Sequence, residues 1–83
     1  MLEDVYAEAR SLVAALRTEH ASDAAEALDR ALYGSTSGEI LTDLGFHLSA
    51  ALRRGDGLSP PTRDRLKALR RRVDSILRRA GQS

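Results

Sequence analysis

Residues 60–80 carry the most regular apolar pattern in the chain. Apolar residues recur there at alternating spacings of three and four, and Leu77 widens the stripe that they form: Leu66, Leu69, Val73, Ile76 and Ala80. This period places them on one face of an α-helix, with arginines at most of the remaining positions. Ser59 precedes Pro60-Pro61, so we expect Ser59 to cap the helix and Pro60 to take its first position, where a missing N–H costs nothing.

The N-terminal half predicts two more helices, over 2–19 and 23–33. The first has its apolar residues on one face: Leu2, Val5, Ala9, Leu12, Val13 and Leu16. The second carries a face of small residues and leucines: Ala24, Leu28, Ala31 and Leu32. Ser22 or Asp23 is placed to cap the second helix, and Gly34 to end it in the left-handed conformation that glycine readily adopts.

A helix over 37–54 is predicted both by the capping residues at its start and by the helical spacing of its apolar residues. Thr36 and Glu39 have the spacing of a capping box, in which each side chain accepts a hydrogen bond from the other's backbone N–H. Gly55-Asp56-Gly57 is expected to end the helix. Its apolar face is Ile40, Leu41, Leu44, Leu48, Ala51 and Leu52.

Four helices joined by short turns predict an all-α fold, a small antiparallel four-helix bundle with a short second helix in one domain over 1–83. Two long helices with a short helix packed across them would give the same pattern, so that alternative stays open. Only three aromatic residues occur among 83. So lean a core favours completion of the bundle by homodimerisation.

Charge is divided unequally along the chain. Residues 1–52 carry three Arg and nine acidic residues, a balance of −6, whereas residues 53–83 carry ten basic residues and three Asp, a balance of +7. Such segregation suits either an anionic partner or acidic and basic parts that lie against each other, within one chain or between two copies.

Several function classes are disfavoured by what the chain lacks. There is no cysteine, so thiolate metal sites and cysteine nucleophiles are excluded. His20 and His47 have neither a spaced partner for acid–base catalysis nor a metal-ligand pattern. The glycines at 34 and 38 do not form a phosphate loop, because Glu39 stands where such a loop needs lysine. We therefore expect no enzyme, no cofactor, no metal and no small-molecule substrate.

The sequence also indicates where the protein resides. No stretch approaches the roughly 18 apolar residues of a membrane span, and the acidic start at Glu3 and Asp4 is unlike a signal peptide. We expect a cytoplasmic protein with no membrane partner.

Phe46 marks the first candidate surface. On a helical wheel it lies opposite Leu44 and Leu48, and large aromatic side chains are enriched at the centres of protein interfaces. Gly45 beside it would allow a second helix to approach closely. The candidate protein interface is Phe46, Ala50, Thr42 and Arg53.

The basic face of 60–80 is the second candidate surface, suited to phosphates without base specificity. Its residues are Arg63, Lys67, Arg70, Arg71 and Arg78. Three features weigh against it. Asp74 is spaced to pair with Arg71 and Arg78, and the acids of the first two helices offer an intramolecular counterpart. No Asn, Gln or aromatic residue lies among the arginines to contact bases.

The favoured hypothesis is a non-catalytic helical module for protein–protein interaction, a small regulatory or immunity-type partner protein acting as a homodimer or as a subunit of a heterocomplex. The comparison with such proteins rests on size alone. Docking would use Phe46, with the arginines of 60–80 meeting acidic groups on the partner. The alternative is nucleic-acid or other polyanion binding through the Arg-rich helix.

Overall fold

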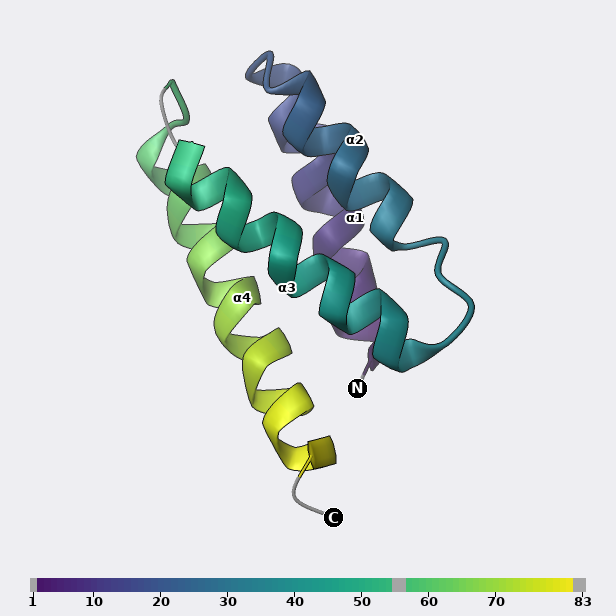
Figure 1. The fold of residues 1–83 in the computed structure, drawn as a ribbon. Helices are drawn as coiled ribbons and strands as arrows, with labels where there is room; N and C mark the ends of the chain where they lie inside the picture. The colour runs from purple at the N-terminus through teal and green to yellow at the C-terminus, as the bar shows by residue number, and fades with distance from the viewer. Residues whose placement is uncertain (1, 55–56, 82–83) are drawn as a thin grey trace.

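The structure, a computed structural model, describes residues 2–54 and 57–81 and contains there four α-helices and no strand (Figure 1). These are α1 (Leu2–Thr18), α2 (Ser22–Ala31), α3 (Ser37–Arg54) and α4 (Pro60–Gly81). Contacts join α1 to α2, α2 to α3, α3 to α4 and α4 to α1, so α1 lies diagonally opposite α3. The predicted all-α antiparallel bundle with a short second helix is confirmed, in place of two long helices crossed by a short one.

The core is one continuous cluster made of Ala, Val and Leu side chains. Each helix contributes the face that its apolar period predicts, and α2 adds Ala25, Leu28 and Ala31. Predicted members Ala24 and Leu32 are only half-buried: Ala25 is buried in place of Ala24, and Leu32 lies beyond the end of α2. Small side chains on α2 let it lie close to both α1 and α3, which is how a ten-residue helix can complete the bundle.

The connection between α1 and α2 is a tight turn centred on His20. His20 has φ 64°, in the left-handed region, and its N–H donates to Arg17 O at 3.1 Å, while Ala21 N–H donates to Leu16 O at 2.8 Å. This pair of bonds is the Schellman motif, with His20 in the position that glycine usually takes. The turn reverses the chain within two residues after Glu19.

The predicted cap of α2 is wrong. Its N-cap is Ala21, which makes no side-chain capping bond, and neither Ser22 nor Asp23 takes the role. The reason is the turn itself, because Ala21 both closes the motif at the end of α1 and accepts the first helical bond of α2, from Ala25 N–H. Ser22 is therefore already inside the helix.

Gly34 does not end α2 as predicted either. The helix ends at Ala31, and Leu32 follows with φ −71° and ψ −12°, a right-handed conformation. Gly34 instead lies close to the next helix: a Cβ there would be 3.0 Å from Ile40 Cγ1, so the Ile40 side chain would have to shift by a few tenths of an ångström. The connection from α2 to α3 thus packs against the first turn of α3.

The start of α3 is capped, but by a modified capping box. Thr36 Oγ1 accepts a hydrogen bond from Glu39 N–H at 3.1 Å, as predicted. The Glu39 carboxylate accepts from Ser35 N–H at 3.2 Å rather than from Thr36, so the return bond is shifted by one residue. At the other end α3 stops at Arg54; Gly55 and Asp56 lie outside the described residues, and Gly57 has φ 86°.

Ser59 caps α4 as predicted, with its Oγ accepting from Thr62 N–H at 3.4 Å. The apolar stripe of α4 is buried only as far as Val73, whereas Ile76 and Leu77 are half-buried and Ala80 is exposed. With 22 residues, α4 is about 33 Å long, and α1 with 17 residues only about 26 Å. No helix of the described part combines the length and the apolar character needed to cross a membrane.

Candidate functional site

The outer face of α3 carries the predicted protein interface. Phe46 is 64% exposed, Thr42 and Arg53 are exposed, and Ala50 is half-buried. We call these four residues the α3 outer face. They lie opposite Leu44 and Leu48, which are completely buried, so the helix separates a core face from a solvent face.

Phe46 has one aromatic neighbour. Its ring and the His47 ring form a T-shaped contact, with centroids 5.2 Å apart and planes at 85°. The contact orients the phenyl ring without burying it. Thr42, Ser49 and Ala50, which lie one turn before and after Phe46 on the helix, have short side chains.

Gly45 serves a different purpose from the one predicted. A Cβ at this position would lie 3.5 Å from Val73 Cγ1, so the residue faces α4 inside the bundle. That distance is an ordinary van der Waals contact, so Gly45 lies against α4 without being required for a close approach. It adds nothing to the α3 outer face.

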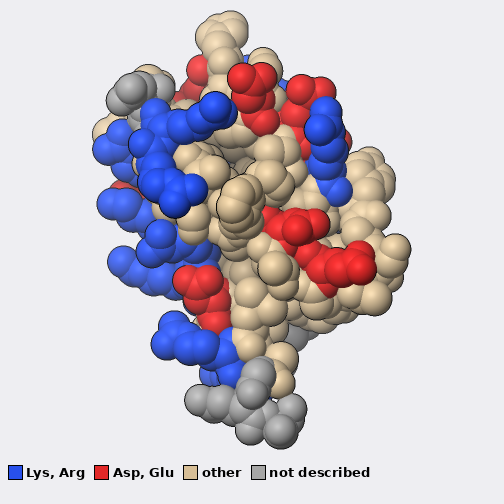
Figure 2. Space-filling view, viewed as in Figure 1, with Lys and Arg blue, Asp and Glu red and all other residues tan. Residues whose placement is uncertain are grey.

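The basic face of α4 is open to solvent. Lys67, Arg71 and Arg78 are exposed, as is Arg63, and Arg70 is half-buried. Figure 2 shows lysine and arginine side chains gathered along the edge that α4 forms in Figure 1, with acidic side chains among them. The Arg70 Nε is enclosed and has no hydrogen-bond acceptor within the described chain.

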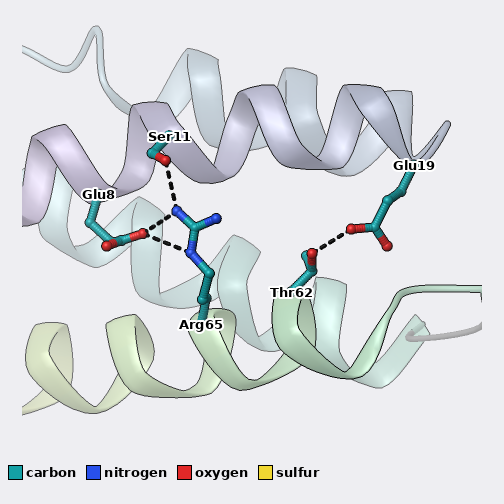
Figure 3. A network of polar contacts seen from close by, with 5 residues as sticks. All are labelled: Glu8, Ser11, Glu19, Thr62 and Arg65. Atoms are coloured by element: carbon teal, nitrogen blue, oxygen red, sulfur yellow. Dashed lines mark hydrogen bonds and ion pairs between the residues drawn. The ribbon is translucent and has the colours of Figure 1, made fainter.

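The intramolecular neutralisation expected for these cations is limited. Among the described residues, Asp74 makes no ion pair with Arg71 or Arg78. The acidic half of the chain reaches α4 through Glu8, which pairs with Arg65 (Figure 3). Lys67, Arg71 and Arg78 are left without an ion pair in the described structure, so their charges face water.

Arg65 forms a small polar network between α1 and α4. It donates to Glu8 Oε1 from Nε at 3.1 Å and from Nη2 at 2.5 Å, and Nη2 also donates to Ser11 Oγ at 2.7 Å. The two charged side chains are 39% and 38% exposed, which limits the pair to about 1 kcal/mol or less. The network links α1 to α4 at their contact.

Glu19 forms a second network, which the sequence did not suggest. Its carboxylate accepts hydrogen bonds from Ser59 N–H at 2.6 Å, from the Ser59 hydroxyl at 3.1 Å and from the buried Thr62 hydroxyl (Figure 3 shows the last of these). The Thr62 hydroxyl, followed by the Ser59 N–H, lowers the pKa of Glu19 below its ordinary value. A residue at the end of α1 thereby caps the start of α4, 40 residues away.

The described residues carry open surface hollows but no cluster of metal ligands. No group of three or more His, Cys, Asp or Glu side chains there is arranged to hold a metal ion. Open hollows of about 330 and 430 Å³ lie at opposite ends of the bundle. The smaller one adjoins His20, Asp23 and Arg54, where the turn between α1 and α2 meets the end of α3.

Comparison with protein-family models, with curated proteins and with solved structures finds no match to this chain. The function is therefore argued from the two surfaces themselves.

Proposed function

We propose that this protein is a non-catalytic protein–protein interaction module that docks through the α3 outer face, as a homodimer or as a subunit of a heterocomplex. The observation that carries the proposal is Phe46. Its phenyl ring is 64% exposed and lies at the middle of α3. The opposite face of that helix is completely buried, so the helix holds the apolar ring on a rigid support.

The surroundings of Phe46 favour docking of a protein surface. Aromatic anchors that enter a partner's pocket supply much of the binding free energy of an interface, provided that neighbouring contacts exclude water. Thr42 and Ala50 lie within one turn of Phe46 and are small enough to let a partner close around the ring. The unpaired cations of α4 on the adjacent edge would meet acidic groups on that partner.

The test is the replacement Phe46→Asp, measured by light scattering on a size-exclusion column and by binding to any partner found. We expect association to be lost while the helical circular dichroism stays nearly unchanged, because the ring contributes nothing to the core. Tyr33→Asp is the matched control, since Tyr33 is 80% exposed but lies between α2 and α3. Unchanged association in Phe46→Asp would refute the proposal.

A second candidate function, binding of a polyanion such as a nucleic acid, is favoured by one observation. Lys67, Arg71 and Arg78 are exposed and unpaired within the described structure, although Asp74 is near enough in sequence to neutralise two of them. Cations left unpaired along one helix match the repeated phosphates of a polyanion. No Asn or Gln lies among them to read base edges, and contacts to phosphates carry no sequence information, so binding would be insensitive to sequence.

A further inference from the structure

The exposed side of α3 is arranged symmetrically about Phe46. Glu39 precedes Phe46 by seven residues and Arg53 follows it by seven, so each lies about 10.5 Å from it along the helix axis, in opposite directions. Seven residues make almost two full turns, so both lie on nearly the same side of α3 as the ring. Thr42 and Ala50 stand four residues before and after Phe46. The row therefore has an aromatic centre, small flanks, an acid at one end and a base at the other.

Both charged ends of this row are open to a partner. Glu39 and Arg53 are exposed, and neither forms an ion pair within the described part of the chain. Glu39 Oε2 accepts a hydrogen bond from Ser35 N–H at 3.2 Å, and its Oε1 accepts none there. The two residues are about 21 Å apart along one helix, so they cannot neutralise each other within one chain.

The position of α3 in the bundle leaves this row accessible. Helix α3 packs on α2 and on α4, and α1 lies diagonally opposite. Figure 1 shows α2 and α4 on either side of α3. At such a corner the outer face of a helix stands forward of its two neighbours. A second helix can therefore pack along Phe46 while α2 and α4 remain behind.

We infer that this second helix is α3 of another copy, packed antiparallel, with the two-fold axis passing between the two Phe46 rings. The inference rests on the proposed docking through the α3 outer face and names its partner. In an antiparallel pair, residues equally distant from Phe46 in opposite directions face each other. Glu39 of each copy then meets Arg53 of the other, so the two-fold axis forms this charge pair twice.

The charges of the row select this arrangement over the alternatives. In a parallel pair, Glu39 would face Glu39 and Arg53 would face Arg53, so both contacts would be repulsive. A partner surface of one charge sign would be attracted at one end of the row and repelled at the other. A second copy carries an acid and a base at the required spacing, and the antiparallel direction brings each to its opposite.

The cations of α4 do not oppose this dimer strongly. The antiparallel arrangement places the two α4 helices on the same side of the interface, each behind its own α3. Because packed helix axes are about 8–10 Å apart, the two α4 axes are separated by roughly 20 Å. That is more than twice the screening length of about 8 Å at physiological salt. The pairs at Glu39 and Arg53 lie in the contact itself.

The first experiment measures the mass of the wild-type protein by sedimentation equilibrium from about 10 µM to 1 mM. The range extends this high because a contact of one helix with another is small and its dimer weak. We expect a dimer that forms with rising concentration and is lost in Phe46→Asp, with unchanged helical circular dichroism. Tyr33→Asp, which changes an aromatic residue outside the row, should dimerise like wild type.

The second experiment reverses the charges at the two ends of the row. Glu39→Arg alone and Arg53→Glu alone each set like charges together twice, so each should raise the dissociation constant about tenfold or more. The double variant Glu39→Arg with Arg53→Glu restores opposite charges and should dimerise like wild type. An equimolar mixture of the two single variants should form a heterodimer for the same reason.

Matched controls separate this effect from net charge and from folding. Glu26→Arg and Arg30→Glu make the same changes of charge at exposed positions of α2, and both should leave the dissociation constant unchanged. Glu39→Arg also removes the acceptor of the Ser35 N–H, so thermal unfolding of each variant checks its stability. The double variant carries the same loss, and Arg53→Glu does not carry it.

The outcomes distinguish this inference from the proposed function. A monomer at all concentrations would overturn the inferred dimer and leave docking of a different protein on the α3 outer face. A dimer lost in Phe46→Asp but insensitive to the charge reversals, or not restored in the double variant, would overturn the antiparallel arrangement alone. A dimer that persists in Phe46→Asp would contradict both. Loss in each single reversal with recovery in the double variant would establish the pairing of Glu39 with Arg53 across the two-fold axis.

Discussion

At the scale of single residues, His20 is the clearest departure from what its residue type prefers. A side chain with a Cβ in the left-handed region costs roughly 1 kcal/mol, and glycine is the residue that avoids this cost. The sequence contains no glycine at this turn, so neither the Schellman motif nor the consequent start of α2 at Ser22 could be foreseen. The neighbouring Glu19 was missed for a different reason, because its partners are 40 or more residues away.

Replacing His20 by glycine should stabilise the protein. We expect His20→Gly to raise the free energy of unfolding by about 1 kcal/mol, which corresponds to a melting temperature higher by roughly 4–8 °C for a domain of this size. Thermal unfolding followed by circular dichroism measures the change. His20→Ala is the control, because alanine keeps the Cβ; equal stability of the two variants would show that backbone strain at this position is unimportant.

The Glu19 network makes a prediction about pH. Hydrogen bonds that favour the charged carboxylate lower its pKa in the folded protein, so their stabilisation is present above the usual value near 4.5 and is lost as pH falls through the lowered folded value. Glu19→Gln should therefore be less stable than wild type at pH 7, by a margin that shrinks at pH 3. Urea unfolding at both pH values tests this, with Glu26→Gln, an exposed glutamate of α2, as control. A margin that does not change with pH would contradict it.

At the scale of helices, the sequence predicts correctly those features that depend only on residues close to one another in the chain. Thr36 with Glu39, and Ser59 with Pro60, place the starts of α3 and α4 at the observed residues, since a cap is decided within four residues. The wheel position of Phe46 agrees with its exposure for the same reason. Periodicity also identified the apolar face of α4, but it could not reveal how far the neighbouring helices extend, and so gave no sign that Ile76 lies beyond the buried part.

Alanine replacements at two positions of the α4 apolar stripe should therefore lower the free energy of unfolding by different amounts. Leu69 is 1% exposed in the middle of the bundle, so Leu69→Ala should lower the free energy of unfolding by about 2–5 kcal/mol, through lost burial and the cavity left behind. Ile76→Ala, measured at a concentration where the chain is monomeric, should cost less than half as much because Ile76 is only half-buried. Urea unfolding provides both values.

The loss of stability expected for Leu69→Ala is large compared with the total stability of so small a domain. Stabilities of 0.05–0.15 kcal/mol per residue imply about 4–12 kcal/mol in total, so Leu69→Ala can remove much of it. If that variant is unfolded at 25 °C, Leu69→Val gives a smaller cavity and a measurable loss. A cost below about 1 kcal/mol for Leu69→Ala, or equal costs at the two positions, would contradict the assignment of Leu69 to the core.

At the scale of the whole molecule, the bundle keeps its opposite charges largely apart. The described structure joins the acidic and basic parts through Glu8 and Arg65 and through the Glu19 cap, while Lys67, Arg71 and Arg78 of α4 form no ion pair there. This division is what makes three partners conceivable: an acidic protein, a second copy and a polyanion. Their dependence on salt and on particular residues separates them.

Of the three partners, the polyanion is the one that salt dependence can identify most clearly. If α4 binds phosphates, the logarithm of the affinity for mixed-sequence double-stranded DNA should fall linearly with the logarithm of the salt concentration. Replacing Arg71 and Arg78 by glutamine should reduce that slope by about 2, one for each phosphate contact removed. Fluorescence anisotropy between low and moderate salt measures it, and Arg10→Gln with Arg17→Gln, two exposed arginines of α1, supplies the same change of charge elsewhere. Equal slopes in the two double variants would mean that net charge, and not the α4 surface, attracts DNA. Absence of binding at low salt would contradict polyanion binding altogether, and only protein partners would then remain as candidates.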